Sequence, residues 1–196
     1  NAGEIVRLME AQAQRGLIIG VCSSRFLFQS HVEPIREWIR QGHLGEPRLL
    51  RCRVNLSSRG RPETYPPAWR VKKENNGGGL MANWGCYDFD YLLGLTDWQL
   101  QPELVAAQTW GLPPVIADYF PAESDSETHG TAWIRMSNGA VFTYERGEYM
   151  SGEPEQTWQI IGTKGSLLLP MTWPEEKKIT ATRLDPEAGV VTETLW

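Results

Sequence analysis

The sequence lacks an excess of basic residues: 19 Lys and Arg stand against 24 Asp and Glu, which gives a formal net charge of −5. A protein that binds nucleic acid or an anionic membrane through phosphate contacts needs a basic surface, so this balance argues against both partners. No apolar run approaches the length of a membrane span, and no internal repeat or low-complexity segment is present. With 41% hydrophobic and 22% charged residues, the composition is that of an ordinary globular protein.

Cysteine is scarce, and its spacing forms no recognisable pair. The chain has three cysteines, an odd number, at Cys22, Cys52 and Cys86. They lie far apart and form no CxxC motif. This pattern argues against a disulfide framework and a zinc site, and it fits the reduced, buried thiols of a cytoplasmic protein. We therefore expect no metal and a reducing compartment.

Both ends of the chain lack the features of natural termini. The first residue is an asparagine instead of an initiator methionine, and residues 190–196 end the chain inside an alternating run that is typical of a strand. We therefore expect a piece of a longer protein. The missing signal peptide then says nothing about localisation.

The N-terminal part predicts two helices and one strand. Residues 3–15 place apolar side chains at helical spacing, and the capping box Ser30-x-x-Glu33 begins a second helix that ends at Gly42. Between these helices, residues 17–22 are continuously apolar. Such a run is typical of a strand buried on both faces, as in a parallel sheet covered by helices.

The remainder of the chain predicts one further helix and many strands. Residues 50–56 alternate between apolar and polar, as a half-buried antiparallel strand does, and a connection over 57–79, rich in Pro, Gly and charge, leads to a helix over about 80–95. Further strands are predicted at 103–110, 130–137, 140–146, 156–162, 166–170, 178–184 and 190–195. This order indicates an α+β fold with a largely antiparallel, open sheet and helices on one face.

The helix over 80–95 carries the clearest chemical pattern. Helical spacing places Asn83, Tyr87 and Asp90 on one side. The other side is apolar, with Met81, Trp84, Leu92 and Leu95. A phenol can give a proton to a substrate oxygen or take one from it, and an amide and a carboxylate can hold sugar-like hydroxyls. From spacing alone, a polar face turned to solvent is the competing interpretation.

Two other segments have weaker patterns. Asp125, Glu127 and His129 alternate and could share one face, but no fourth ligand lies nearby, so a solvated entry to a strand is favoured over a metal site. The glycines at 77–79 precede a helix, where backbone N–H groups could meet an anion. Because they form no GxGxxG motif after a parallel strand, we assign them no dinucleotide role.

The stretch from Gly77 to Asp90, GGGLMANWGCYDFD, resembles the GGG-x-x-x-D-x-G-x-H-x-x-D signature of the Gfo/Idh/MocA oxidoreductases, relatives of glucose-fructose oxidoreductase and inositol dehydrogenase. Other segments agree with that family in order and spacing: Ser24-Arg25-Phe26, Gly42-x-x-Gly45-Glu46-Pro47, Trp69-Arg70, Ser137-Asn138-Gly139 and Ile161-Gly162-Thr163-Lys164-Gly165-Ser166. The resemblance covers about residues 1–170.

The resemblance implies a two-domain enzyme. Family members have an N-terminal Rossmann domain that binds NAD or NADP, with a GxGxxG loop and the active-site Lys of an E-K-P motif. Neither motif is in this chain. Residues 1–22 would then be the last helix and strand of the Rossmann domain. Residues 23–196 would be the C-terminal substrate-binding and oligomerisation domain, truncated at its end.

The resemblance also implies roles for the polar face of the helix. The family's Asp falls on Asn83, its catalytic His on Tyr87 and its final Asp on Asp90. Tyr at the His position resembles the glucose-fructose oxidoreductase branch, in which the phenol is the acid or base. Tyr87 is therefore the first candidate for proton transfer, with Asn83 and Asp90 positioning hydroxyls. Asn in place of Asp leaves a neutral hydrogen-bonding group where the family has a charge.

Three further residues are implied to lie near the cofactor. Trp69 and Arg70 would sit at the nicotinamide end, and Arg25 at the domain junction. The resemblance thus implies a parent enzyme that transfers hydride between NAD or NADP and a sugar, cyclitol or similar polyol, forms a homo-oligomer through its open sheet, and is inactive as the isolated fragment. The alternative is a subunit-assembly module with a vestigial active site.

Overall fold

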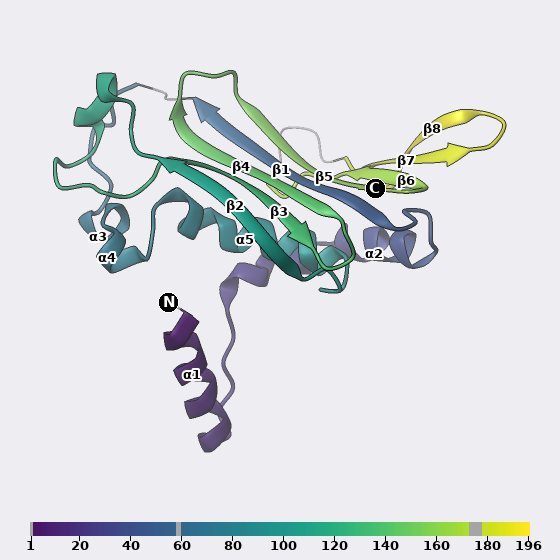
Figure 1. Cartoon of the computed structure of the whole chain (residues 1–196), viewed down its shortest axis with the longest axis horizontal. Helices are drawn as coiled ribbons and strands as arrows, with labels where there is room; N and C mark the ends of the chain where they lie inside the picture. The colour runs from purple at the N-terminus through teal and green to yellow at the C-terminus, as the bar shows by residue number, and fades with distance from the viewer. Residues whose placement is uncertain (1, 58–59, 173–177) are drawn as a thin grey trace.

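The computed structural model describes residues 2–57, 60–172 and 178–196. Eight strands in this part form one open sheet in the order β2-β3-β4-β1-β5-β6-β7-β8 (Figure 1). They are β1 (Pro47–Ser57), β2 (Pro102–Trp110), β3 (His129–Met136), β4 (Val141–Met150), β5 (Glu155–Gly162), β6 (Gly165–Leu168), β7 (Thr180–Asp185) and β8 (Gly189–Thr194). Every neighbouring pair is antiparallel except β1 and β4.

The described part of the chain also contains helices, and only some of them cover the sheet. The helices are α1 (Ala2–Arg15), the 3₁₀ helix η1 (Cys22–Phe28), α2 (Val32–Arg40), α3 (Ala68–Val71), α4 (Lys73–Asn76), α5 (Leu80–Leu95) and the 3₁₀ helix η2 (Pro114–Tyr119). In Figure 1, α5 and α2 lie under the sheet, whereas α1 stands away from it. The predicted α+β fold, with its largely antiparallel open sheet and helices on one face, is confirmed. No described helix is both long and apolar enough to cross a membrane.

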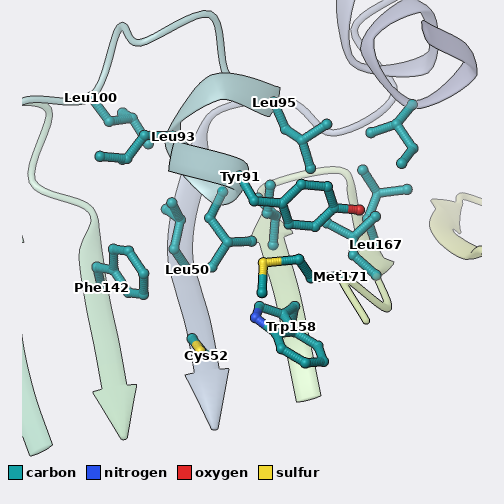
Figure 2. Packing of buried hydrophobic residues seen from close by; sticks show 14 of the residues in the cluster. Leu50, Cys52, Tyr91, Leu93, Leu95, Leu100, Phe142, Trp158, Leu167 and Met171 are labelled. Atoms are coloured by element: carbon teal, nitrogen blue, oxygen red, sulfur yellow. The ribbon is translucent and has the colours of Figure 1, made fainter. Parts of the chain in front are cut away.

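Strand alternation places the core between the sheet and α5. Leu50 and Cys52 of β1, and Phe142 of β4, point to the helix side and are buried, as Figure 2 shows. They meet Tyr91 and Leu95, which α5 presents from its covered side (Figure 2). The opposite face of the sheet stays open, because no described element packs over it and its side chains alternate with the buried ones. The alternation of side chains along the strands and the helical spacing along α5 thus bury apolar residues in a single layer between the sheet and the helix.

The prediction of a strand over residues 17–22 is wrong. Residues 17–21 form no ladder with any described strand, and Cys22 already belongs to η1. Val21 has extended dihedral angles, φ −115° and ψ 127°, but Ile18 is 99% exposed. A strand needs a neighbour to pair with, and the described chain supplies none here. The division into residues 1–22 and 23–196 remains a prediction.

Three local predictions also need correction. β1 is not purely antiparallel, since it pairs antiparallel with β5 and parallel with β4. The predicted capping box is not formed: His31, not Ser30, precedes α2, and no side chain caps its first turn. The connection over 57–79 contains the two short helices α3 and α4. The predictions over 3–15 and 80–95 agree with α1 and α5.

His31 is a buried titratable group at the start of α2. It is 1% exposed, and its Nε2 atom forms a hydrogen bond of 3.0 Å with the hydroxyl of Tyr91 on α5. Burial disfavours the charged imidazolium and lowers the pKa of His31 to about 4. Because an unperturbed imidazole titrates near 6.5, the unfolded chain binds the extra proton first as the pH falls.

The protein is therefore expected to lose stability as the pH falls from 6.5 towards 4. The contribution of His31 is complete above the unfolded pKa, and the loss amounts to on the order of 2–3 kcal/mol. Urea unfolding at several pH values measures it. His31→Gln should abolish this part of the pH dependence, whereas His43→Gln, at an exposed site, should retain it. Identical pH profiles for His31→Gln and the wild type would contradict the assignment.

Candidate functional site

The start of α5, just after the triple glycine, is capped by a carboxylate that lies far away in the sequence. Glu127 Oε1 accepts hydrogen bonds from the backbone N–H groups of Gly79, at 2.7 Å, and Met81, at 3.1 Å. Its backbone oxygen accepts another from Leu80 N at 2.9 Å. A Cβ atom on Gly79 would collide with the backbone of Glu127, so this approach requires glycine. The anion at this helix N-terminus is the protein's own carboxylate.

Glu127→Ala is expected to lower the free energy of unfolding by about 1–2 kcal/mol, because it leaves one buried and one partly buried N–H group at the start of α5 without their acceptor. Chemical denaturation measures this loss. Glu123→Ala, at an exposed position just upstream, is the matched control and should change stability by less than about 0.5 kcal/mol. Equal midpoints for the two variants would show that Glu127 does not cap α5.

Tyr87 lies against η1 and packs, partly buried, against the edge of the core. Arg25 Nη1 donates a hydrogen bond of 3.2 Å to the phenolic oxygen of Tyr87, and its guanidinium carbon lies 4.3 Å from the ring centroid. The rings of Phe26 and Trp84 meet the Tyr87 ring edge-on, at centroid distances of 5.6 and 5.7 Å. The phenol is thus fixed on two sides, with its oxygen beside a cation.

Asn83, one turn before Tyr87, lines a different part of the site. It borders a cavity of about 100 Å³ together with Arg70 of α3 and with Thr128, Glu148 and Tyr149. The structure therefore brings two predicted residues, Asn83 and Arg70, to one cavity.

The remaining predicted residues lie elsewhere. Trp69 is 57% exposed and is not among the described residues that line this cavity. Asp90 is absent from that lining too; its Oδ2 atom is buried and has no partner in the described part of the chain. Burial raises the pKa of Asp90. Of the six predicted residues, Arg25 contacts Tyr87 and Asn83 shares a cavity with Arg70, so the six do not form one cluster.

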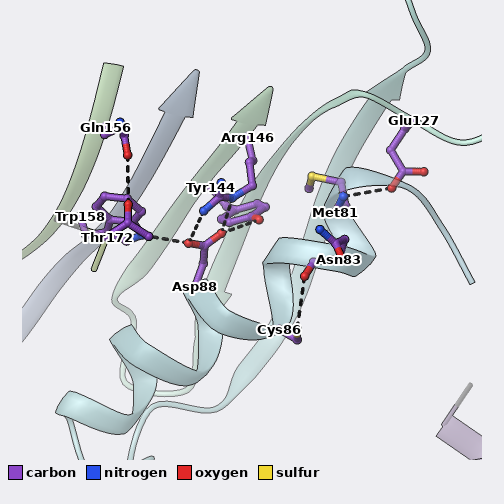
Figure 3. A network of polar contacts seen from close by, with 10 residues as sticks. All are labelled: Met81, Asn83, Cys86, Asp88, Glu127, Tyr144, Arg146, Gln156, Trp158 and Thr172. Carbon is purple, nitrogen blue, oxygen red and sulfur yellow. Dashed lines mark hydrogen bonds and ion pairs between the residues drawn. The ribbon is translucent and has the colours of Figure 1, made fainter. Parts of the chain in front are cut away.

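A buried charged network behind Tyr87 was not predicted from the sequence. Asp88 is fully buried, and Arg146 of β4 donates to it from Nε at 2.7 Å and from Nη2 at 2.9 Å (Figure 3). The Tyr144 hydroxyl and the Trp158 indole N–H each donate to it at 2.9 Å. Burial, followed by the charge of Asp88, raises the pKa of Tyr144, which keeps that hydroxyl a donor. The network fixes α5 to β4 and β5.

This network reaches Tyr87 through one aromatic ring. The guanidinium carbon of Arg146 lies 4.6 Å from the centroid of Trp84, whose edge meets Tyr87. The pattern that could have revealed Asp88 is its position four residues after Trp84 and four before Leu92, in the middle of the apolar side. A charge at such a position needs a buried partner.

The three residues weighed as a metal site have separate partners. Asp125 accepts a hydrogen bond from the Lys73 backbone N–H at 2.8 Å, and Glu127 caps α5. His129 stacks on Trp110, with centroids 4.9 Å apart. Within the described residues, no group of three or more His, Cys, Asp or Glu side chains is arranged to hold a metal ion.

An open, mostly antiparallel sheet defines the class of this chain as an α+β domain. The helix that covers the sheet follows three glycines and presents a phenol. A family model described as GFO/IDH/MocA C-terminal domain matches residues 32–168. The chain belongs to this family, and the resemblance read from the sequence is confirmed. No curated protein sequence matches the chain.

Solved structures share the fold at low sequence identity. An NAD-binding oxidoreductase from Klebsiella pneumoniae has a TM-score of 0.74 at 16% identity, over 99% of this chain and 51% of its own. An inositol dehydrogenase homolog from Azotobacter vinelandii, complexed with NADH and myo-inositol, has a TM-score of 0.70 at 16% identity. The match covers 98% of this chain and 46% of that structure's chain. UDP-N-acetylglucosamine 3-dehydrogenase from Acidithiobacillus ferrooxidans has a TM-score of 0.65 at 18% identity, and the match covers 99% of this chain and 53% of that enzyme's chain. The chain spans about half the length of these structures.

Proposed function

We propose that this chain is the substrate domain of a nicotinamide-dependent oxidoreductase that moves hydride between NAD(P) and a carbon of a sugar, cyclitol or similar polyol. The observation that carries the proposal is the contact between Arg25 and the Tyr87 oxygen, at the position that matches the family's catalytic His. The similar structures support it, since their names include an inositol dehydrogenase homolog with myo-inositol and a dehydrogenase of a sugar nucleotide.

In this proposal Tyr87 moves the proton. Oxidation of an alcohol to a ketone releases one proton and one hydride, and the phenolic oxygen takes the proton or, in the reverse direction, returns it. Arg25 stabilises negative charge on that oxygen because it donates a charged hydrogen bond to it. Asn83 would hold a substrate hydroxyl through its amide. Asp90 keeps the proposed positioning role, although it does not line the cavity of Asn83.

Only a few of the described residues are suited to contact a nicotinamide cofactor. The N–H groups at the start of α5 already bind Glu127, so they do not offer a pyrophosphate site. Trp69 and Arg70 of α3 and Arg25 of η1 are exposed, and we propose that they contact the nicotinamide end. When bound, NAD or NADP would supply or accept the hydride. The main cofactor contacts would come from a separate Rossmann domain.

A second candidate function rests on the open face of the sheet. On that face, Leu104 of β2 is 46% exposed and Trp133 of β3 is 43% exposed. An exposed apolar strip on a broad sheet suits a contact between two copies of the chain. A purely assembly-related role would need this contact and no chemistry at Tyr87. Sedimentation of the full-length protein tests it, and a monomer would exclude it.

The direct test is an assay of the full-length protein with NAD⁺ or NADP⁺ and a panel of sugars and cyclitols, followed by nicotinamide absorbance. We expect reduction of the nucleotide with at least one polyol. Failure with every polyol, together with a stable oligomer, would favour the assembly role. The isolated chain is expected not to bind NADH at micromolar concentration, and tight binding would refute the assignment of domains.

A further inference from the structure

The end of β4 contains an irregularity that changes where two side chains point. β1 and β4 pair Asn55 with Gly147 and Ser57 with Met150, so two residues of β4 stand opposite one residue of β1. The two residues are Glu148 and Tyr149, opposite Leu56, so β4 has one residue more than a regular ladder would. Tyr149 has a φ of 60°, in the left-handed region that is uncommon for an aromatic residue. Bulges of this kind re-aim side chains and occur next to active sites.

The bulge brings both side chains to one cavity. Tyr144 and Arg146 point to the helix side of β4, and Glu148 continues this alternation. In a regular strand the next residue would face the opposite side of the sheet. Instead, Tyr149 lines the same cavity of about 100 Å³ as Glu148 and Asn83. Glu148 and Tyr149 also line two larger neighbouring hollows, of about 490 and 350 Å³.

The walls of this cavity carry groups that recognise hydroxyls. Asn83 offers an amide, Glu148 a carboxylate, and Arg70 a cation beside it. Thr128 is 4% exposed, and its Oγ1 atom has no hydrogen-bond partner within the described residues. A buried hydroxyl without a partner is costly, so a ligand that reaches it is favoured. The volume admits several groups the size of water, which suits one end of a polyol.

The Glu148 carboxyl is partly buried, with two cations and an indole N–H around it. Burial raises the pKa of Glu148, whereas the charges of Arg70 and Arg146 and a hydrogen bond from Trp84 act in the opposite direction. Trp84 also contacts Tyr87, so Glu148 and the phenol are linked through one indole ring. The backbone N–H of Glu148 donates to Thr128 O at 2.9 Å, which fixes the bulge against the strand entry.

We propose that Glu148 is the carboxylate that binds and orients a substrate hydroxyl in this cavity, in the place of the charge that Asn83 lacks. Tyr149 and Thr128 bind the neighbouring hydroxyl of the same neutral polyol. This inference rests on the proposed function for its class of ligand, but it concerns binding and not the proton transfer at Tyr87.

The test uses the full-length protein and myo-inositol and glucose as probes, with binding measured by calorimetry and turnover measured separately. Glu148→Gln keeps the shape and removes the charge, and we expect it to weaken binding of the better probe about 10- to 100-fold. Glu153→Gln, an exposed site on the following turn, is the control and should bind as the wild type does. Asn83→Asp/Glu148→Gln moves the charge across the cavity and should regain about tenfold.

Three results would overturn the inference: unchanged binding in Glu148→Gln, no recovery in the double variant, or no binding of either probe by the wild type. Binding that requires Glu148 in a protein without turnover would refute the proposed function alone and leave the inference standing. If Glu148→Gln does not fold, Thr128→Val replaces it, since it removes a hydroxyl from the same cavity with nearly the same shape. Its polyol binding should also fall, and unchanged binding would contradict the proposal.

Discussion

Tyr87→Phe is expected to reduce turnover of the full-length enzyme by about 10²- to 10⁴-fold, the usual contribution of a positioned acid or base. The substitution keeps the ring that packs against Phe26 and Trp84 and removes only the oxygen to which Arg25 donates. Folding should therefore be little affected. Affinity for the nicotinamide cofactor should also stay the same, because the phenol holds the substrate's proton and not the nucleotide. Steady-state turnover and cofactor titration measure the two effects.

Tyr91→Phe is the matched control for this prediction. It removes another phenolic oxygen from α5, one turn further on, where the hydroxyl is buried and bonded to His31. We expect it to cost about 1 kcal/mol of stability and to leave turnover within a few-fold of the wild type. Unchanged turnover in Tyr87→Phe, or equal losses in both variants, would remove Tyr87 from the chemistry.

The sequence predicted the elements whose patterns are local. α5 agrees with its predicted range because its apolar residues at helical spacing and the glycines that precede it lie within one segment. The strands predicted at 130–137 and 140–146 likewise agree with β3 and β4, and Gly139 between them has a φ of 82°, which suits a tight turn. Residues 17–22 show the limit of local patterns: an apolar run predicts a strand, but only a neighbouring strand makes it one.

The parts of the site that the sequence did not predict are contacts between distant residues. Arg146 lies 58 positions from Asp88, and Glu127 lies 48 positions from the N–H group of Gly79 that it accepts from. Neither local sequence predicts which distant residue will be the partner. Glu148 is a third case, because its place in the cavity depends on a bulge that only the pairing of β1 with β4 shows. The contact between Arg25 and Tyr87 was not predicted either, because the family resemblance implied only that Arg25 lies at the domain junction.

Asp88→Asn is expected to lower the free energy of unfolding by about 3–5 kcal/mol, the usual cost of leaving a buried charge without its partner. All the groups around the Asp88 oxygens donate: Arg146 twice, Tyr144 and Trp158. The amide nitrogen of asparagine would face two of these donors, and the Arg146 charge would lose its counterion. The whole free energy of unfolding of such a domain is about 5–15 kcal/mol, so this loss is a large part of its stability.

Urea unfolding of the chain measures this loss, and Asp97→Asn is the control. Asp97 follows α5, its side chain is exposed, and it lies 3.8 Å from Arg36, so its replacement should change stability by less than about 0.5 kcal/mol. Asp88→Asn/Arg146→Met removes the stranded charge as well, so its loss should be smaller than the sum of the two single losses. Strictly additive losses, or an Asp88→Asn midpoint equal to that of Asp97→Asn, would show that the network does not hold α5 to the sheet.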